Sequence, residues 1–298
     1  MPRRLTILAS MCKHRKVVNM IKRNAMVDFL ISVLRIAVLA YVGMALVLAG
    51  CQRHMMYYPM RVSESNALAL AGTDGLEPWR DDDGNIIGWR PADSNPEADI
   101  LLFFHGNAGF GAQRGYMVHG FSPRMTVYIM EYPGYGTRAG RPSEQAFYRA
   151  AAAAFSALRE AHPDQQIFLG GESLGSGVAC HLAGRFPDKV AGLFLSTPFN
   201  HLVDVARYHY PVFPVRWLMR DRYHSAKHLA AYDGPLALLL AGRDEVVPAR
   251  FGHKLADAYA GPTRIWLQED RSHNTLDYRP GSTWWQEALD FLGVRNDG

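Results

Sequence analysis

The stretch IFLGGESLGSGVACHLA, residues 167–183, constrains the fold of this chain more than any other stretch. A short apolar run enters glycines that flank a lone serine, and small residues with helical character follow. Gly171 and Gly175 on either side of Ser173 are what a sharp strand-to-helix turn requires, because side chains there would collide with neighbouring backbone. Such a turn holds the hydroxyl away from the sheet. G-x-S-x-G arises by chance in roughly one chain of this length in ten, so a function needs partner residues elsewhere.

Beyond residue 85, short apolar runs alternate with longer helical stretches. The predicted strands are 85–90, 99–105, 126–131, 166–170, 190–196, 236–242 and 263–268. The predicted helices are 143–161, with Ser143 as N-cap, 174–186, 248–260 and 282–292. The later strands are continuous apolar runs, which indicates burial on both faces. The alternation therefore predicts an α/β fold with a mostly parallel sheet and helices on both faces, whereas residues 52–85 are predicted to be irregular.

Chemically competent side chains follow the ends of the predicted strands. The run His105–Asn107 follows the second strand, and Ser173 follows the fourth. Asp244 follows the sixth strand, and His273 lies a few residues beyond the seventh. Ligands of open α/β sheets bind beyond the carboxyl ends of the strands. We therefore expect these positions to converge on one edge of the sheet.

Ser173, Asp244 and His273 are the candidate residues for nucleophilic catalysis. A serine hydroxyl is a weak acid, so a base must take its proton, and histidine has a suitable pKa. The imidazolium then needs a fixed carboxylate, and the chain order Ser, Asp, His is the one that G-x-S-x-G enzymes use. Glu245 is the alternative acid, whereas Glu172 is interpreted as a turn residue of the motif.

Other histidines fit the role of base less well. His105 is interpreted as a structural hydrogen-bonding residue of its loop. His224 and His228 are spaced to share a helix face, but no third ligand accompanies them, so they are a weak metal candidate. We predict no metal and no cofactor.

An acyl-transfer site also needs backbone N–H donors for the developing oxyanion. Leu174, at the start of the helix behind the serine, offers one such N–H group near the positive helix end. Asn107, in HGNAGFGA, is the second predicted donor. A phosphate-binding loop would require a Lys-Ser/Thr ending, which this stretch lacks.

With these residues the chain resembles the serine hydrolases of the α/β-hydrolase fold. More narrowly, it is similar to the membrane-anchored α/β-hydrolase-domain group, which includes serine-aminopeptidase-like bacterial proteins and eukaryotic protein depalmitoylases. The matching stretches are YYP, FFHGNAG, EYPGYG, GESLGSGVA, LSTPF, GRDEVVP and SHN, in this order between residues 57 and 274. DRSHN lacks the glycine that often precedes the histidine of this group. The resemblance implies Ser173 as nucleophile, Asp244 as acid, His273 as base, and Asn107 with Leu174 as oxyanion donors.

Residues 1–50 form a basic leader with an apolar segment. They contain eight Lys and Arg residues against Asp28 alone, so the remaining chain carries a net charge of −3 and offers no electrostatic basis for binding nucleic acid. Residues 36–50 are uncharged and have the length of a signal-peptide core. The ending LAGC resembles the lipobox of bacterial lipoproteins, which implies lipidation of Cys51.

The alternative for this leader is an uncleaved single-span anchor from about residue 29 to residue 50, with Arg35 reaching the interface. Both interpretations predict a cell-envelope protein attached to the membrane, with its body outside the cytoplasm. Met1, Met20 and Met26 are the candidate start residues. Cys180 is predicted to be a buried small apolar residue.

Residues 51–298 are predicted to form a single catalytic domain with a short cap inserted at about 200–232. Phe213, Trp217 and Leu218 either line an acyl groove or cover the sheet. The predicted function is hydrolysis of carboxylic ester, thioester or lipid acyl bonds through an acyl-enzyme intermediate, on bulky or membrane-borne substrates. The alternatives are a serine peptidase with the same three residues and a non-catalytic envelope lipoprotein. No oligomeric state is predicted.

Overall fold

The computed structural model describes residues 3–121 and 124–295, with side chains described from residue 19 onward. Contacts divide the chain into two units, Met1–Gln52 and Arg53–Gly298. The predicted division at residue 50, with a single domain from residue 51, stays a prediction. Met1, one of the candidate start residues, lies outside the described residues.

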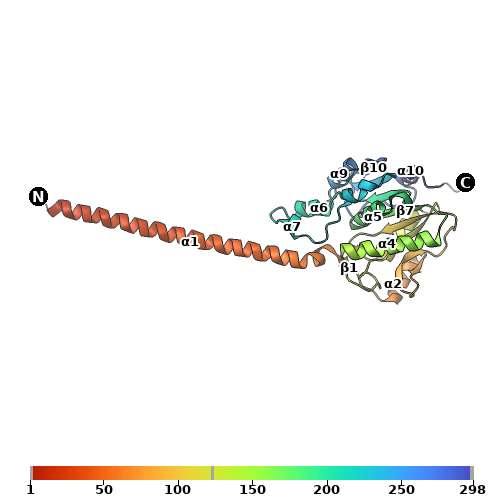
Figure 1. Ribbon diagram of the computed structural model, residues 1–298, viewed down its shortest axis with the longest axis horizontal. Helices are drawn as coiled ribbons and strands as arrows, with labels where there is room; N and C mark the ends of the chain where they lie inside the picture. Colours follow the sequence, from red (N-terminus) through yellow and green to blue (C-terminus); the bar gives the residue numbers. More distant parts are fainter. Residues whose placement is uncertain (1–2, 122–123, 296–298) are drawn as a thin grey trace. The chain divides into compact units, whose positions relative to one another are not determined.

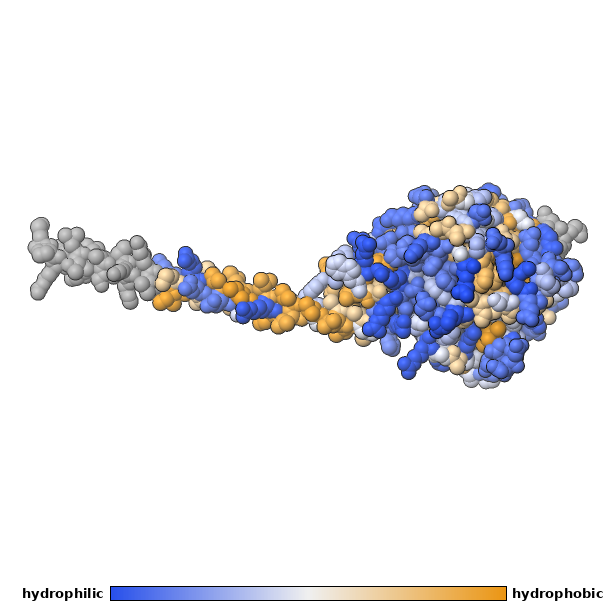
Figure 2. All heavy atoms as spheres, in the orientation of Figure 1, coloured by the Kyte–Doolittle hydropathy of each residue, from blue (hydrophilic) through white to orange (hydrophobic). Residues whose placement is uncertain are grey.

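The first unit consists of one helix, α1 (Arg3–Met56), whose last turn belongs to the second unit. Its part Asn19–Met56 is long and apolar enough to cross a membrane by length and composition, a test that a signal sequence also passes. Exposed apolar side chains line this part of the helix (Figure 2). The helix therefore has the character of an anchor or a signal segment.

The second unit, drawn in Figure 1, is built on a mostly parallel sheet. The sheet has eight strands in the order β10-β9-β8-β7-β4-β6-β3-β2. The strands are β2 (Leu76–Arg80), β3 (Ile86–Pro91), β4 (Asp99–Phe104), β6 (Met125–Met130), β7 (Ile167–Glu172), β8 (Leu193–Ser196), β9 (Leu236–Ala241) and β10 (Thr263–Gln268). The pairs β2–β3 and β3–β6 are antiparallel, and the other neighbours are parallel. A separate parallel pair joins β1 (Tyr58–Pro59) to β5 (Ala108–Gly109).

Helices cover both faces of the sheet. The helices of this unit are α2 (Glu64–Thr73), α3 (Gly115–Phe121), α4 (Glu144–Ala161), α5 (Leu174–Arg185), α6 (Leu202–His209), α7 (Val215–Leu218), α8 (Ser225–His228), α9 (Arg250–Ala258) and α10 (Thr283–Leu292). Short 3₁₀ turns lie at η1 (Gly111–Arg114), η2 (Pro187–Lys189) and η3 (Leu229–Ala231). Helices α4, α5 and α9 contribute to one hydrophobic cluster, and α2, α3 and α10 contribute to the other.

Strand β4 shows how the sheet divides the two clusters. Ile100, Leu102 and Phe104 point into the α4–α5 side, and Leu101 and Phe103 point into the α10 side, all of them fully or almost fully buried. This alternation follows from the period of two in a strand. The α/β fold class is thereby confirmed. The predicted burial on both faces holds for β4, β6, β8 and β9, whereas β10, at the edge of the sheet, is only partly buried.

The predicted strands and helices are found with small shifts at their ends, and Ser143 caps α4 by accepting a hydrogen bond from the Ala146 N–H at 3.2 Å. The prediction for residues 52–85 is wrong. This region contains α2, which Ser63 caps, and β2, which forms an antiparallel pair with β3. The buried face of α2 consists of Ala67 and Ala71, which leave little hydrophobic periodicity in the sequence.

The segment 200–232 contains α6, α7, α8 and η3. In α7 the buried residue is Val215, and the neighbouring Trp217 is 86% exposed. Residues two positions apart lie on nearly opposite faces of a helix, so the burial of Val215 directs Trp217 toward solvent. Trp217 therefore does not cover the sheet as one of the two predictions required.

Candidate active site

Ser173 lies on the turn between β7 and α5, with a φ of 52°. A Cβ atom at Gly175 would overlap the carbonyl oxygen of Phe104, and one at Gly171 would stand 2.6 Å from the Gly175 carbonyl carbon. Both glycines are therefore required by close backbone packing, as the sequence predicted. A positive φ at a serine costs about 1–3 kcal/mol, and the packing around the turn holds it there.

Ser173, His273 and Asp244 meet at the carboxyl edge of the sheet. The hydroxyl oxygen of Ser173 lies 3.1 Å from Nε2 of His273, and Nδ1 of His273 lies 2.7 Å from Oδ2 of Asp244. The backbone N–H groups of Val246 and Val247 donate to Oδ1 of Asp244 at 2.8 and 2.7 Å. Because the carboxylate accepts at Nδ1, the proton of a neutral imidazole sits there and Nε2 is free to accept the serine proton.

The acid and the base of this set differ in their access to solvent: the carboxylate is buried, and the imidazole can be reached from a pocket. The Asp244 side chain is 1% exposed, and the His273 side chain is 12% exposed and borders a pocket. Glu245, the alternative acid, is exposed to solvent, and the contacts of His273 go to Asp244. The geometry therefore favours Asp244 over Glu245.

Glu172, which precedes the serine, has more contacts than a turn residue requires. It accepts hydrogen bonds from Arg114 at 3.1 and 3.2 Å and from the Tyr116 hydroxyl at 2.7 Å. Burial alone would raise the pKa of the Glu172 carboxyl, but Arg114 and Tyr116 stabilise the carboxylate and leave its pKa below the usual value. Arg114 also donates to the Ala108 carbonyl at 3.2 Å, so it joins this turn to the loop after β4.

The loop after β4, residues 105–109, lies directly against the serine turn. A Cβ atom at Gly106 would stand 2.8 Å from Oε1 of Glu172. Asn107 follows Gly106, and Leu174 is the first residue of α5. The two predicted oxyanion donors therefore belong to adjacent segments, and their role remains a prediction.

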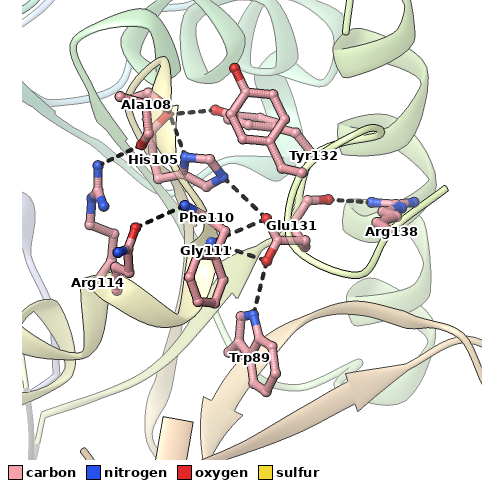
Figure 3. Close-up of polar contacts among 12 residues, drawn as sticks. Trp89, His105, Ala108, Phe110, Gly111, Arg114, Glu131, Tyr132 and Arg138 are labelled. Carbon is pink, nitrogen blue, oxygen red and sulfur yellow. Dashed lines mark hydrogen bonds and ion pairs between the residues drawn. The ribbon is translucent and has the colours of Figure 1, made fainter. Parts of the chain in front are cut away.

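A buried polar network supports this loop from the side of β6 (Figure 3). Glu131, fully buried, accepts hydrogen bonds from the Trp89 indole N–H at 3.1 Å and from the Gly111 N–H at 3.0 Å. Nε2 of His105 lies 3.6 Å from the Glu131 carboxyl, and Nδ1 of His105 lies 2.8 Å from the Gly106 carbonyl. His105 is thus a structural hydrogen-bonding residue, as expected.

A pocket of about 800 Å³ opens beside His273. Its described lining residues are Arg114, Tyr116, His119, Glu172, Arg271, His273, Asn274, Leu276, Asp277, Tyr278, Arg279 and Pro280. Phe213, Trp217 and Leu218 are absent from this described lining, so the acyl groove predicted for them is not this pocket. The pocket mixes charged and aromatic side chains, and the Tyr116 and Tyr278 rings lie 5.1 Å apart within it.

Histidines elsewhere are engaged in other contacts. His224 accepts a hydrogen bond from the Lys227 N–H at 3.3 Å, and its ring stacks on that of His201. His228 lies 3.3 Å from the Tyr148 hydroxyl. Among the residues with described side chains, no group of three His, Cys, Asp or Glu residues is arranged to hold a metal ion. Cys180 is buried, as predicted.

The fold and the three convergent side chains define an α/β-hydrolase, and the comparison with known families agrees. The family profile described as alpha/beta hydrolase fold matches residues 99–288, so the chain belongs to this family.

Particular relatives cover most of the chain. An uncharacterized protein of Mycobacterium tuberculosis is 32% identical over 269 residues, which cover 87% of this chain and 94% of that protein. The lysophosphatidylserine lipase ABHD12 of Xenopus tropicalis is 27% identical over 268 residues, covering 80% of this chain and 69% of the lipase.

Solved structures share the fold at lower identity. An esterase of Pyrococcus furiosus matches with a TM-score of 0.59 and 13% identity, over 80% of this chain and 97% of the esterase. A monoacylglycerol lipase of Paleococcus ferrophilus matches with a TM-score of 0.51 and 17% identity, over 69% of this chain and 98% of the lipase. At this identity the likeness shows the fold alone.

Proposed function

We propose that this protein is a serine hydrolase of carboxylic ester, thioester or lipid acyl bonds. The observation that carries the proposal is the continuous contact from Ser173 through His273 to Asp244, with distances of 3.1 and 2.7 Å. Membership of the α/β-hydrolase family and the lipase among the sequence relatives support it. A buried carboxylate, an imidazole and a strained serine in this order have no evident structural purpose together.

The proposed reaction begins when Nε2 of His273 takes the Ser173 proton and the serine oxygen attacks the acyl carbon. Asp244 holds the ring in the required tautomer and stabilises the imidazolium. The N–H groups of Asn107 and Leu174 stabilise the oxyanion. Collapse of the tetrahedral intermediate breaks the bond to the leaving group, which takes the proton from His273. A water molecule, activated by the same imidazole, then releases the acid and restores the serine.

The pocket beside His273 supports a substrate whose leaving group carries polar or charged groups. Arg114 and Arg279 are paired there with Glu172 and Asp277, and Arg271 adds a further guanidinium to the lining. A pocket lined by these charged side chains can form hydrogen bonds with a polar leaving group, and it offers little apolar surface against which an alkyl chain could pack. We therefore place the alcohol or thiol part of the substrate on this side of His273.

The test is turnover by the purified full chain on a matched substrate panel. The panel contains p-nitrophenyl esters of graded acyl length, a lysophospholipid, an acyl-cysteine thioester and an aminoacyl-arylamide. The proposal expects hydrolysis of esters or thioesters and a loss of about 10⁴-fold or more in Ser173→Ala. Hydrolysis of the arylamide alone would make the protein a peptidase. Equal activity of the wild type and Ser173→Ala would overturn the proposal.

A further inference from the structure

Residues 53–62 comprise the last turn of α1 and the chain that connects it to the rest of the body, and their backbone pairs with the loop that contains Asn107. This connecting segment forms a parallel strand pair with the loop, in which Tyr58 is opposite Ala108 and Pro59 is opposite Gly109. The Tyr58 N–H donates to the Asn107 carbonyl at 2.9 Å. A second bond of the same kind joins Met60 to Gly109 at 3.0 Å.

Asn107 is held by its side chain as well as by its carbonyl. Nδ2 of Asn107 donates to the Met56 carbonyl at 2.8 Å, so the side chain binds the connecting segment where α1 ends. The Tyr135 hydroxyl gives the Asn107 carbonyl a second hydrogen bond, at 2.8 Å. The carbonyl therefore has two donors, one of which is the backbone of the connecting segment at Tyr58.

The peptide on the other side of Asn107 is also fixed. Nδ1 of His105 donates to the Gly106 carbonyl at 2.8 Å. In a trans peptide the N–H group points opposite to the carbonyl, so this bond sets the direction of the Asn107 N–H. The connecting segment then prevents the residue from rotating or moving along the loop.

The connecting segment is itself anchored to the segment 200–232, where the cap was predicted. Arg53 binds Asp221 through two hydrogen bonds of 2.7 and 3.0 Å, and the Tyr57 hydroxyl reaches the same carboxyl at 3.1 Å. The Tyr57 and Tyr223 hydroxyls are 3.0 Å apart. Asp221 and Tyr57 are each 3% exposed. A carboxylate this buried requires its charged partner, so the segment has a strongly preferred position.

We propose that the connecting segment is a positioning element of the oxyanion hole, with Tyr58 and Met56 holding Asn107 through their backbone groups. The inference rests on the proposed function, because it assigns a purpose to these contacts only if the Asn107 N–H stabilises an oxyanion. The residues that follow the apolar helix then act on catalysis only by positioning Asn107 through their backbone, so one stretch of chain joins the apolar helix to the oxyanion donor.

The first test compares Tyr58→Pro with Tyr58→Phe in the full chain. Proline removes the N–H that donates to Asn107, whereas phenylalanine keeps it and changes only an exposed ring. The expected result is a fall in kcat of about 10- to 100-fold for Tyr58→Pro, with KM unchanged, and wild-type values for Tyr58→Phe. The end point of titration with a fluorophosphonate should stay at one label per chain, because Ser173 and His273 remain in place.

The second test uses Asn107→Ala, which keeps the residue's own N–H and removes the amide that donates to Met56. We expect kcat to fall as it does in Tyr58→Pro. We also expect a parallel loss of affinity for a trifluoromethyl ketone, which forms a tetrahedral adduct with the serine. The double variant should lose less than the product of the two single effects, since both contacts hold one residue.

Three outcomes separate the possibilities. Wild-type kcat and ketone affinity in both Tyr58→Pro and Asn107→Ala would overturn the inference and leave the proposed function standing. A titration end point that falls in proportion to kcat would also overturn it, since the segment would then serve folding alone. Absence of both labelling and hydrolysis in the wild type would overturn the proposed function, and the inference with it.

Discussion

Asp244 and Glu245 are neighbours in the chain, and the structure places them in opposite surroundings. Asp244 is buried, accepts two backbone N–H groups and lies 2.7 Å from Nδ1 of His273. Glu245 is exposed. A carboxylate that is fixed by backbone donors can orient an imidazole, whereas a solvated carboxylate next to it contributes little.

This difference gives a prediction at the scale of single residues. Asp244→Asn should lower kcat for ester hydrolysis by about 10⁴-fold, because the amide stabilises the wrong tautomer of His273. Glu245→Gln is the matched control and should keep wild-type turnover. Steady-state kinetics on one p-nitrophenyl ester decide between them. A sensitive Glu245 beside a tolerant Asp244 would show that the acid is misassigned.

Residue patterns predicted the candidate site in part. Ser173, Asp244 and His273 were found because each follows the end of an apolar strand, and parallel strands bring such ends together. Glu131 was missed, although a carboxyl group that closes an apolar strand is a signal of a buried partner. Tyr58 was missed for a different reason. Its contact is made by the backbone, and no side-chain pattern reports which segment pairs with which loop.

At the scale of elements, strands buried on both faces were the most predictable part of the fold. Strands β4, β6, β8 and β9 are almost uninterrupted apolar runs that are buried along their whole length, and few other structures accommodate such runs between turns. Helix α2 and strand β2 were not predicted. Their stability comes from packing of small residues and from pairing with β3, and neither leaves a periodic apolar pattern.

The packing of α5 against α4 creates a pH-sensitive contact. The His181 ring stacks on Tyr148 at 3.6 Å, and its Nδ1 is buried without a hydrogen-bond partner among the described residues. Burial, together with the nearby His228 and Arg185, lowers the pKa of His181 to about 4. The imidazole is therefore neutral in the folded protein at pH values where it is protonated in the unfolded chain.

The sign of the pH effect follows from that pKa. The unfolded pKa is about 6.5, so between pH 6.5 and 4 the unfolded chain binds a proton that the folded protein does not. The free energy of unfolding should therefore fall as the pH falls through this window. His181→Phe keeps the stacked ring and should reduce the slope of the free energy of unfolding against pH, by the equivalent of up to about one bound proton. Urea unfolding at several pH values measures it, and identical slopes for the two proteins would contradict the prediction.

At the scale of the whole molecule, the chain joins an apolar helix to a hydrolase body. Cys51 is exposed and lies within α1, two residues before Arg53, where the body begins. We propose that Cys51 becomes the lipidated N-terminus of an envelope protein, because it follows Leu48, Ala49 and Gly50 at the end of an apolar run. The alternative is an uncleaved helix that spans the membrane once.

Mass analysis of protein extracted from membranes separates these two forms of attachment. The lipoprotein proposal expects a diacylated Cys51 at the N-terminus, and it expects Cys51→Ser to accumulate with its leader uncleaved. An intact bond between Gly50 and Cys51 in the wild type would favour the single-span anchor. Both outcomes leave the connecting segment in place, so catalysis by the body is measured independently of them.

The central claim is that Ser173 is the nucleophile that His273 activates. The most direct measurement is the site of covalent labelling when the full chain reacts with a fluorophosphonate, mapped by mass spectrometry of its peptides. We predict one adduct per chain, on Ser173, and no adduct in Ser173→Ala or after replacement of His273 by alanine. An adduct on another residue, or labelling that persists in Ser173→Ala, would contradict the claim.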